Sequence, residues 1–444
     1  MTQADTQEEV QRPPARSAFA TLAWAFLERI VPRIGSAAIM LIFAAVTSPT
    51  IVGYYSAMTL AYLAMQALFD SAVRQIAVGA VHTPGGVAFL RRYIKTYALT
   101  GPAVMFGALA IMCAFGSMTL RIALELSPMV LAPVAVASAT RALATAQAAN
   151  LWRRISLTQA VAVIASCTVT IPVVIVTESP LGSALQLLMS ETIFALGVRR
   201  MARGHQMEPG EEPLVSYFHQ FRAASAYTLV SWAQNQADRL FLGLFAGSAT
   251  LGSYSFAGSL SHQVTDSLGV ATANVLRPKV IDGKTKSDAE LRHLVMPTLR
   301  RAMVMTVAVI LVTFPAAYWV APLVFKDDWD SALQIVPVLS ISAVPALVSW
   351  CLSPVLVYQA RLRLATAIKV CGTIMSVGVA VAATYSLELA AWVVVARETI
   401  IMCAIALIGT RRSIGARVLV TPVLLVVVLS GLFLLGKPLY ALFG

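Results

Sequence analysis

Apolar runs of about 20 residues recur along the whole of this chain, and they constrain its fold more than any other feature. A helix of that length crosses the roughly 30 Å hydrocarbon core of a membrane. Of the 444 residues, 58% are hydrophobic and only 12% are charged, whereas a soluble domain carries about 25% charged residues. The sequence therefore predicts an all-α integral membrane protein.

The ends of the apolar runs predict about 13 membrane helices, within a range of 12 to 14, arranged as two six-helix lobes around a central cavity. The first lobe contains helices at 19–46, 51–72, 96–118, 128–150, 155–177 and 182–198. The second contains helices at 219–246, 250–275, 302–325, 332–358, 364–385 and 388–410, and an extra helix follows at 418–436. The predicted domains are a cytoplasmic tail (1–18), an N-terminal lobe (19–198), a cytoplasmic linker (199–218), a C-terminal lobe (219–410) and a C-terminal segment (411–444).

The loop charges predict the orientation of these helices. With alternating loops, 24 of the 33 Lys and Arg residues fall on the side of the N-terminus and 3 on the other side. Cytoplasmic loops carry an excess of Lys and Arg, so we expect a multi-pass protein of the bacterial inner membrane with its N-terminus in the cytoplasm. The first 17 residues are polar and do not resemble a cleavable signal peptide. The basic residues lie in short clusters between apolar runs, so the net charge of +12 does not indicate nucleic-acid binding.

The chain contains a short internal repeat at a shift of about 200 residues. Ser48-Pro-Thr-Ile-Val-Gly53-Tyr-Tyr55 matches Ser248-Ala-Thr-Leu-Gly252-Ser-Tyr254 once one insertion is allowed. Both segments join the first and second helices of a six-helix set. This pattern is typical of a parallel repeat, in which two lobes are related by an axis along the membrane normal.

Ionisable residues inside the predicted helices indicate a polar interior. They are Glu28, Arg29, Arg33, Arg141, Glu191, Asp238, Arg239, Asp266, Arg397 and Glu398. Each would cost about 3 kcal/mol at a helix centre that faced lipid. We therefore expect them to face a water-filled cavity, where they pair with one another or with a charged substrate.

The arginines among them are the predicted substrate-binding residues: Arg29, Arg33, Arg141, Arg239 and Arg397. Arg29 and Arg33 are four residues apart and repel each other on one helix face, so a phosphate or diphosphate between them would be stabilising. The alternative is that both reach the lipid headgroups at the cytoplasmic surface. Asp238 and Arg239 are adjacent and point about 100° apart, so each needs its own partner.

The acidic residues among them, Asp238, Asp266, Glu191 and Glu398, are candidates for coupling to H⁺ or Na⁺, with structural ion pairing as the alternative. We expect no catalytic residue, bound metal or cofactor. The five cysteines lie inside apolar runs without CxxC spacing. Gly283-Lys284-Thr285 resembles the end of a P-loop, but Pro278 stands where the first glycine is required. The sequence thus favours a transporter driven by a gradient over an enzyme.

The stretch Ala237-Asp-Arg-Leu-Phe-Leu-Gly243 to Leu251-Gly252-Ser-Tyr254-Ser-Phe-Ala257 resembles the Wzx-type polysaccharide flippases. These share a superfamily with multidrug and toxin extrusion transporters and lipid II flippases. Ser48-Pro49 through Tyr55 and Pro278 also resemble the family pattern, whereas a helix after the twelfth departs from it. The resemblance implies two six-helix lobes around a V-shaped cavity and translocation of an undecaprenyl-diphosphate-linked oligosaccharide.

The leading functional hypothesis is therefore a flippase for exopolysaccharide, capsule or O-antigen assembly. Its expected partners are the lipid-linked oligosaccharide, membrane lipids, and a glycan polymerase with glycosyltransferases. One alternative is a cation-coupled multidrug exporter, which should have fewer arginines in its cavity and one dominant carboxylate. Another is a membrane component of glycan synthesis, a glycosyltransferase or polymerase, although all of the predicted outer loops are short.

Overall fold

The structure is a computed structural model that describes residues 15–114, 118–203, 214–276, 288–358, 362–409 and 412–443. The regular secondary structure of these residues is entirely helical. Ten of the described helices are long and apolar enough to span a membrane. The predictions for the tail before residue 15, for most of the linker, and for Pro278 and Gly283-Lys284-Thr285 concern residues outside the described ranges.

The N-terminal half of the chain forms six helical segments. They comprise α1 (Ala15–Val46), α2 (Pro49–Met65) with η1 (Gln66–Asp70) and α3 (Ser71–Ala80), α4 (Pro84–Ala114), α5 (Leu120–Leu126) with η2 (Ser127–Leu131) and α6 (Ala132–Ala148), α7 (Trp152–Thr177), and α8 (Leu181–Ala202). The second segment continues through the π-helical turn η1 to Ala80, beyond the predicted end at 72. Arg74, predicted in a loop, therefore lies inside a helix.

The C-terminal half forms seven further segments. They comprise α9 (Leu214–Phe245), α10 (Gly247–Leu276), α11 (Asp288–Pro315) with η4 (Ala316–Val320) and α12 (Ala321–Val324), η5 (Asp327–Trp329) with α13 (Asp330–Tyr358), α14 (Leu362–Ala383), α15 (Leu387–Ala404) with η6 (Ile405–Gly409), and α16 (Arg412–Phe443). Counted in this way, the described residues form 13 segments that overlap the 13 predicted helices. The predicted fold class is confirmed.

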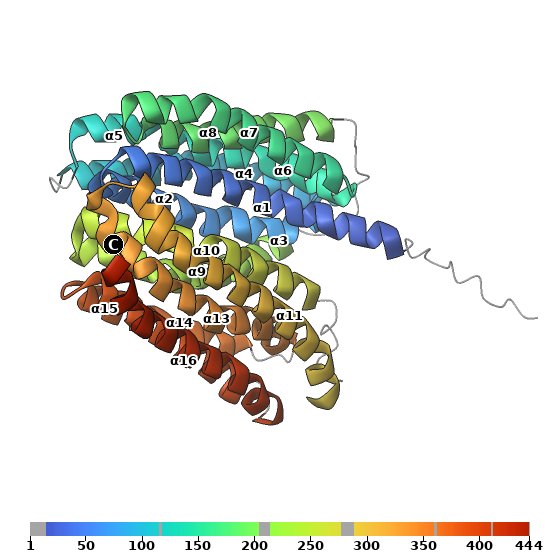
Figure 1. Cartoon of the computed structure of the whole chain (residues 1–444). Coiled ribbons are helices and arrows are strands. Elements are labelled where there is room, and N and C mark those ends of the chain that lie inside the picture. Colours follow the sequence, from blue (N-terminus) through green and yellow to red (C-terminus); the bar gives the residue numbers. More distant parts are fainter. Residues whose placement is uncertain are drawn as a thin grey trace, which may run out of the picture.

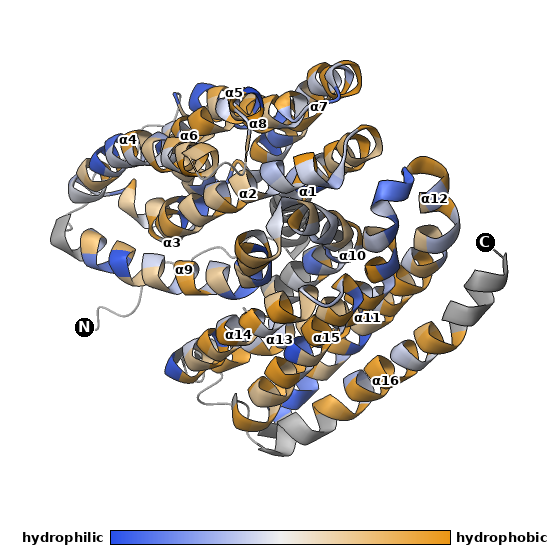
Figure 2. Ribbon diagram, turned by 90° about the vertical axis from the view of Figure 1, so that its left-hand side faces the viewer, coloured by the Kyte–Doolittle hydropathy of each residue, from blue (hydrophilic) through white to orange (hydrophobic). Residues whose placement is uncertain are grey.

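The two halves lie side by side, with the N-terminal half above the C-terminal half in Figure 1. Seen along the helices in Figure 2, they form two groups, and α16 lies on the outside of the C-terminal group. Among the ten candidate membrane spans, the one at Asp327–Ser353, which contains most of α13, is the most buried. Many large apolar side chains elsewhere are exposed, among them Leu99, Val176 and Leu323, as expected for helices that face lipid.

The repeated glycines mark a close approach between the two halves. Gly53 and Gly252 lie in the second turns of α2 and α10. A Cβ atom on Gly53 would overlap the carbonyl oxygen of Ser248, and one on Gly252 would overlap that of Pro49. Two helix backbones can approach this closely only where side chains are absent. The internal repeat found in the sequence is therefore also a packing contact.

Trp329 adds a second contact at the same end of the molecule. Its side chain is fully buried, and its ring centroid lies 4.5 Å from that of Phe256. The indole Nε1 donates a hydrogen bond to the backbone oxygen of Thr47 at 3.3 Å, so a C-terminal residue holds the end of α1. We call this region, with the loops at 47–48, 246 and 325–326, the outer end, because the loop charges predict that it faces away from the cytoplasm.

α9 packs against α2, η1, α3 and α4 of the N-terminal half, and against α14 of the C-terminal half. The Thr228 hydroxyl donates to the backbone oxygen of Ala67 in η1 at 2.6 Å. Nearer its start, Tyr217 accepts a hydrogen bond from the Thr83 hydroxyl at 2.9 Å, and Phe221 packs against Tyr93. α9 therefore connects the two halves of the molecule.

A methyl group added at Gly53 tests the glycine contact. We expect Gly53→Ala to lower the free energy of unfolding by about 1–3 kcal/mol, because overpacking forces the backbones of α2 and α10 apart. Thermal unfolding of the purified protein in detergent measures this effect. Gly107→Ala on α4 is the matched control, since a Cβ there meets no atom within 4 Å. Equal stability of the two variants would contradict the proposed role of this contact.

Candidate functional site

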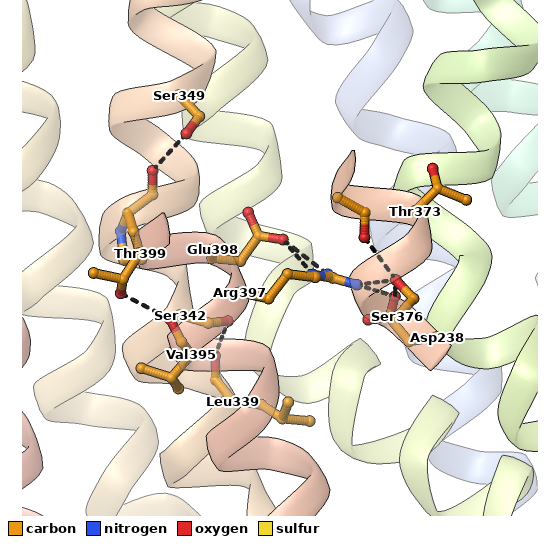
Figure 3. Close-up of polar contacts among 12 residues, drawn as sticks. Asp238, Leu339, Ser342, Ser349, Thr373, Ser376, Val395, Arg397, Glu398 and Thr399 are labelled. Atoms are coloured by element: carbon orange, nitrogen blue, oxygen red, sulfur yellow. Dashed lines mark hydrogen bonds and ion pairs between the residues drawn. The ribbon is translucent and has the colours of Figure 1, made fainter. Parts of the chain in front are cut away.

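The first buried charge cluster lies in the C-terminal half, where four helices meet around Asp238 (Figure 3). Asp238 on α9 receives hydrogen bonds from Tyr254 on α10 at 2.9 Å and from Ser376 on α14 at 3.1 Å. Arg397 on α15 forms an ion pair with the same carboxylate. On its other side, Arg397 donates to Glu398 at 2.8 Å through Nη2 and at 3.2 Å through Nε. We call these five residues the C-terminal cluster.

Local sequence positions the helices that bring this cluster together. α15 begins after Ser386, whose hydroxyl caps it by accepting a hydrogen bond from the amide of Leu389 at 3.0 Å. Gly372 lies one turn before Ser376. A Cβ at Gly372 would meet Ile401 at 2.8 Å and Gln234 at 3.4 Å, so the absence of a side chain lets α14 approach α15 and α9.

The C-terminal cluster is deeply buried and its hydrogen bonds are well satisfied. Asp238 and Arg397 are only 5% and 4% exposed. Burying either charge alone would cost several kcal/mol, and the partner charge and the surrounding hydroxyl donors offset that cost. As expected from their adjacency, Asp238 and Arg239 do not pair: the Arg239 guanidinium donates to Gln236 at 3.4 Å.

A second cluster lies in the N-terminal half, and sequence analysis predicted only part of it. Arg74 on α3 forms ion pairs with Asp70 at 2.7 Å and with Glu28 on α1 at 3.6 Å. Glu191 on α8 accepts a hydrogen bond from the Tyr62 hydroxyl on α2 at 3.0 Å, and Tyr62 accepts one from Gln66 at 3.1 Å. We call these six residues the N-terminal cluster.

The list of ten intramembrane charges omitted Asp70 and Arg74. Their spacing of four residues, which favours an ion pair on one helix face, was the available signal. The apolar run ends near residue 72, so the predicted helix at 51–72 leaves Arg74 in a loop. In the structure the second helical segment continues to Ala80. A charged pair that compensates itself can lie inside a helix without interrupting it.

The remaining predicted residues are distributed over both halves. Arg33 lies half-buried on α1 and Arg141 lies exposed on α6, while Asp266 lies half-buried on α10, one turn after His262. α1 is helical through residues 29 and 33, but the side chain of Arg29 lies outside the described part of the chain. The structure thus joins Asp238, Arg397 and Glu398 in one cluster and holds Glu191 in another.

The Asp238–Arg397 pair makes a prediction about stability. Arg397→Gln leaves the buried Asp238 carboxylate without its ion-pair partner and should lower the free energy of unfolding by about 3–5 kcal/mol, whereas Asp238→Asn leaves Arg397 paired with Glu398 and should cost less. The double variant should lose less than the sum of the two single effects, because the Asp238–Arg397 interaction is lost only once. Thermal unfolding in detergent measures all three. Strict additivity would show that the two groups do not interact.

Solved structures with a similar fold are membrane transporters. A lipid II flippase, MurJ, in an inward closed conformation aligns with a TM-score of 0.69 at 11% identity, and the alignment covers 96% of each chain. A multidrug resistance MATE family transporter of the MOP superfamily in an outward-facing conformation gives 0.62 at 12% identity, over 90% of this chain and 96% of that one. A MOP superfamily transporter from Pyrococcus furiosus gives 0.59 at 12% identity, over 94% and 96%. These likenesses establish the fold.

No curated protein sequence matches the chain. A family model does match: residues 93–334 fit the model of the family described as polysaccharide biosynthesis protein. The matched range covers more than half of the chain, from the first third of α4 into α13. It includes Glu191, Asp238 and the segment Ala237–Ala257 that carries the sequence resemblance to polysaccharide flippases. The chain belongs to this family of polysaccharide biosynthesis proteins.

Proposed function

We propose that the protein translocates an undecaprenyl-diphosphate-linked oligosaccharide across the bacterial inner membrane for exopolysaccharide, capsule or O-antigen assembly. The observation that carries this proposal is the match to the polysaccharide biosynthesis family in a chain whose fold is that of flippases and related transporters. A protein made of apolar helices without a nucleotide-binding motif is suited to moving a finished lipid-linked glycan across the membrane. Glycosyltransferases and a glycan polymerase would be its functional partners.

The substrate has three parts that need different surroundings. The diphosphate requires cationic hydrogen-bond donors, the sugar requires a polar passage, and the polyprenyl tail remains in lipid. Arginine guanidinium groups bind phosphate oxygens through charge-assisted hydrogen bonds. We assign the diphosphate to Arg29 and Arg33 on α1, with Arg141 and Arg239 as further cationic groups. Arg397 can join them only if its pair with Asp238 opens.

The contacts at the outer end fit a transporter that opens alternately to the two sides of the membrane. The Gly53–Gly252 crossing and the Trp329–Thr47 hydrogen bond hold the two halves together there. With the N-terminus in the cytoplasm, as the loop charges predict, this state is closed toward the periplasm. Opening that side requires both contacts to separate, together with the apolar cluster around them, which includes Phe43 and Phe256.

The driving force proposed for transport is an ion gradient. The four candidate carboxylates differ in their surroundings. Asp238 and Glu398 both contact Arg397, whereas Glu191 has a hydrogen bond from a neutral phenol. Asp266 lies on α10 one turn from His262. Asp238→Asn should reduce transport if this carboxylate couples the ion, and an unchanged gradient dependence would exclude that role.

A cation-coupled multidrug exporter is the competing proposal, since the solved structures of similar fold include multidrug transporters. A membrane glycosyltransferase or polymerase is a third. Deletion of the gene distinguishes them. Loss of drug resistance with normal glycan supports the exporter, loss of glycan synthesis without accumulation of the lipid-linked unit supports the enzyme, and accumulation of that unit on the cytoplasmic side supports the flippase.

The arginine assignment makes a direct prediction. The double variant Arg29→Ala, Arg33→Ala should insert normally but accumulate lipid-linked oligosaccharide in the cytoplasmic leaflet, with secreted polysaccharide reduced at least tenfold. The measurement is extraction of the lipid-linked unit together with quantification of secreted glycan. Arg121→Ala is the control, because the Arg121 side chain is exposed on α5 and forms an ion pair with Glu125. Normal secretion by the double variant would refute the anion site.

A further inference from the structure

Glu191 is half-buried on α8 and, unlike Glu28, Asp70, Asp238 and Glu398, it has no ion-pair partner within the described residues. Its contact is the hydrogen bond donated by Tyr62 at 3.0 Å. The nearby Arg74 guanidinium is already held by Asp70 at 2.7 Å and by Glu28 at 3.6 Å. An ionised Glu191 would therefore add an uncompensated negative charge to a cluster in which two carboxylates already share one arginine.

The position of Glu191 makes that charge costly. It lies ten residues into α8, which begins at Leu181, or about 15 Å along the helix and thus near the middle of a hydrocarbon core about 30 Å thick. An isolated carboxylate is strongly disfavoured in such surroundings, and binding a cation or a proton removes the cost. The C-terminal cluster avoids this problem, because Arg397 compensates Asp238.

Tyr97 is a second and independent sign that the N-terminal cluster receives a ligand. Its side chain is fully buried, and its hydroxyl has no hydrogen-bond partner among the described residues. The ring stacks on Phe69 in η1, with the centroids 4.8 Å apart and the planes 9° from parallel. The hydroxyl interacts electrostatically with Asp70, Glu191 and Arg74. A buried phenol without a partner is expensive, and it supplies a spare donor and acceptor beside the acidic groups.

The chemistry of the cluster favours a proton over a metal ion. Among the described residues, no group of three or more His, Cys, Asp or Glu side chains is arranged to hold a metal ion. Na⁺ prefers several oxygen ligands converging on one point, whereas a proton needs a single carboxylate oxygen. Glu191 offers that oxygen, and its hydrogen-bonded neighbour Tyr62 holds the side chain in place.

We propose that Glu191 binds and releases the proton that is coupled to transport. The coupling to transport rests on the proposed function, whereas the proton site itself does not. The charged and titratable groups that face Glu191 come from five elements: Glu28 on α1, Tyr62 on α2, Asp70 on η1, Arg74 on α3 and Tyr97 on α4. α8 thus presents its carboxylate to the interior of the N-terminal half.

The same cluster adjoins a contact between the two halves. Asp70 belongs to the π-helical turn η1, and Ala67 in that turn accepts the hydrogen bond from Thr228 of α9. π-helical turns within α-helices often occur at functional sites. Protonation of Glu191 removes its repulsion with Asp70, so the charge on α8 acts on the turn that α9 contacts. The protonation state of Glu191 can thereby affect the contact between η1 and α9, and through it the relative position of the two halves.

Infrared difference spectroscopy of the purified, lipid-reconstituted protein tests the proton site without any substrate. Between high and low pH, the wild type should gain the carbonyl band of a protonated carboxylic acid, and Glu191→Gln should lose that band. Glu178→Gln, at an exposed position just after α7, is the matched control and should keep it. In Tyr62→Phe the band should remain at a changed frequency, because the phenol no longer donates a hydrogen bond.

Several results would overturn the proposal. A band that is unchanged in Glu191→Gln assigns the proton to another residue. A band that disappears when Na⁺ is added at constant pH makes Na⁺ the ligand. In vesicles that carry lipid-linked oligosaccharide, a proton gradient should raise the rate of translocation by the wild type at least tenfold. It should not raise the rate of translocation by Glu191→Gln. If the wild type moves no oligosaccharide yet the band depends on Glu191, the proposed function fails and the proton site stands.

Discussion

The cost of burying charge in an apolar membrane is the constraint on which this structure depends. A helix assembled largely from Ala, Val, Leu and Ile can tolerate a carboxylate or guanidinium only beside a compensating group. The C-terminal half meets this requirement by joining α9, α10, α14 and α15 through Asp238 and Arg397. The N-terminal half meets it only in part. Arg74 forms ion pairs with Asp70 and Glu28, whereas Glu191 accepts a hydrogen bond from the Tyr62 hydroxyl. This local imbalance is the basis of the proposal that Glu191 is a proton site, whereas Asp238 holds helices together.

A second constraint is how the two halves hold together at the outer end, where the proposed function requires that they can also separate. The contact there is made by two glycines and one tryptophan within an apolar cluster that continues across both halves and includes Phe43, Val52 and Phe256. Backbone contact at Gly53 and Gly252 provides close van der Waals packing, and Trp329 contributes a single hydrogen bond to the end of α1. The backbone packing and the hydrogen bond make this contact specific, and the surrounding apolar cluster makes it extensive.

The sequence predicted the helical fold well because the membrane makes the pattern of apolar residues unusually informative. All 13 predicted helices overlap described helical segments, and the internal repeat coincides with the glycine contact. The predicted ends were less accurate where polar residues continue a helix beyond the apolar run, as at Arg74. The pairing of Asp238 with Arg397 could not be predicted, because 159 residues separate them and only the packing of α14 against both α9 and α15 brings them together. The same holds for Glu191 and Tyr62, which are 129 residues apart.

Translocation by the purified protein tests the central claim most directly. The protein would be reconstituted into vesicles that carry an undecaprenyl-diphosphate-linked oligosaccharide in both leaflets, and a membrane-impermeant reagent would modify the exposed sugars. If the protein is a proton-driven flippase, an imposed proton gradient should make nearly all of the oligosaccharide accessible, compared with only the outer-leaflet half in protein-free vesicles. Accessibility that stays at half, in vesicles where the protein is folded and exports a cationic drug, would contradict the flippase function.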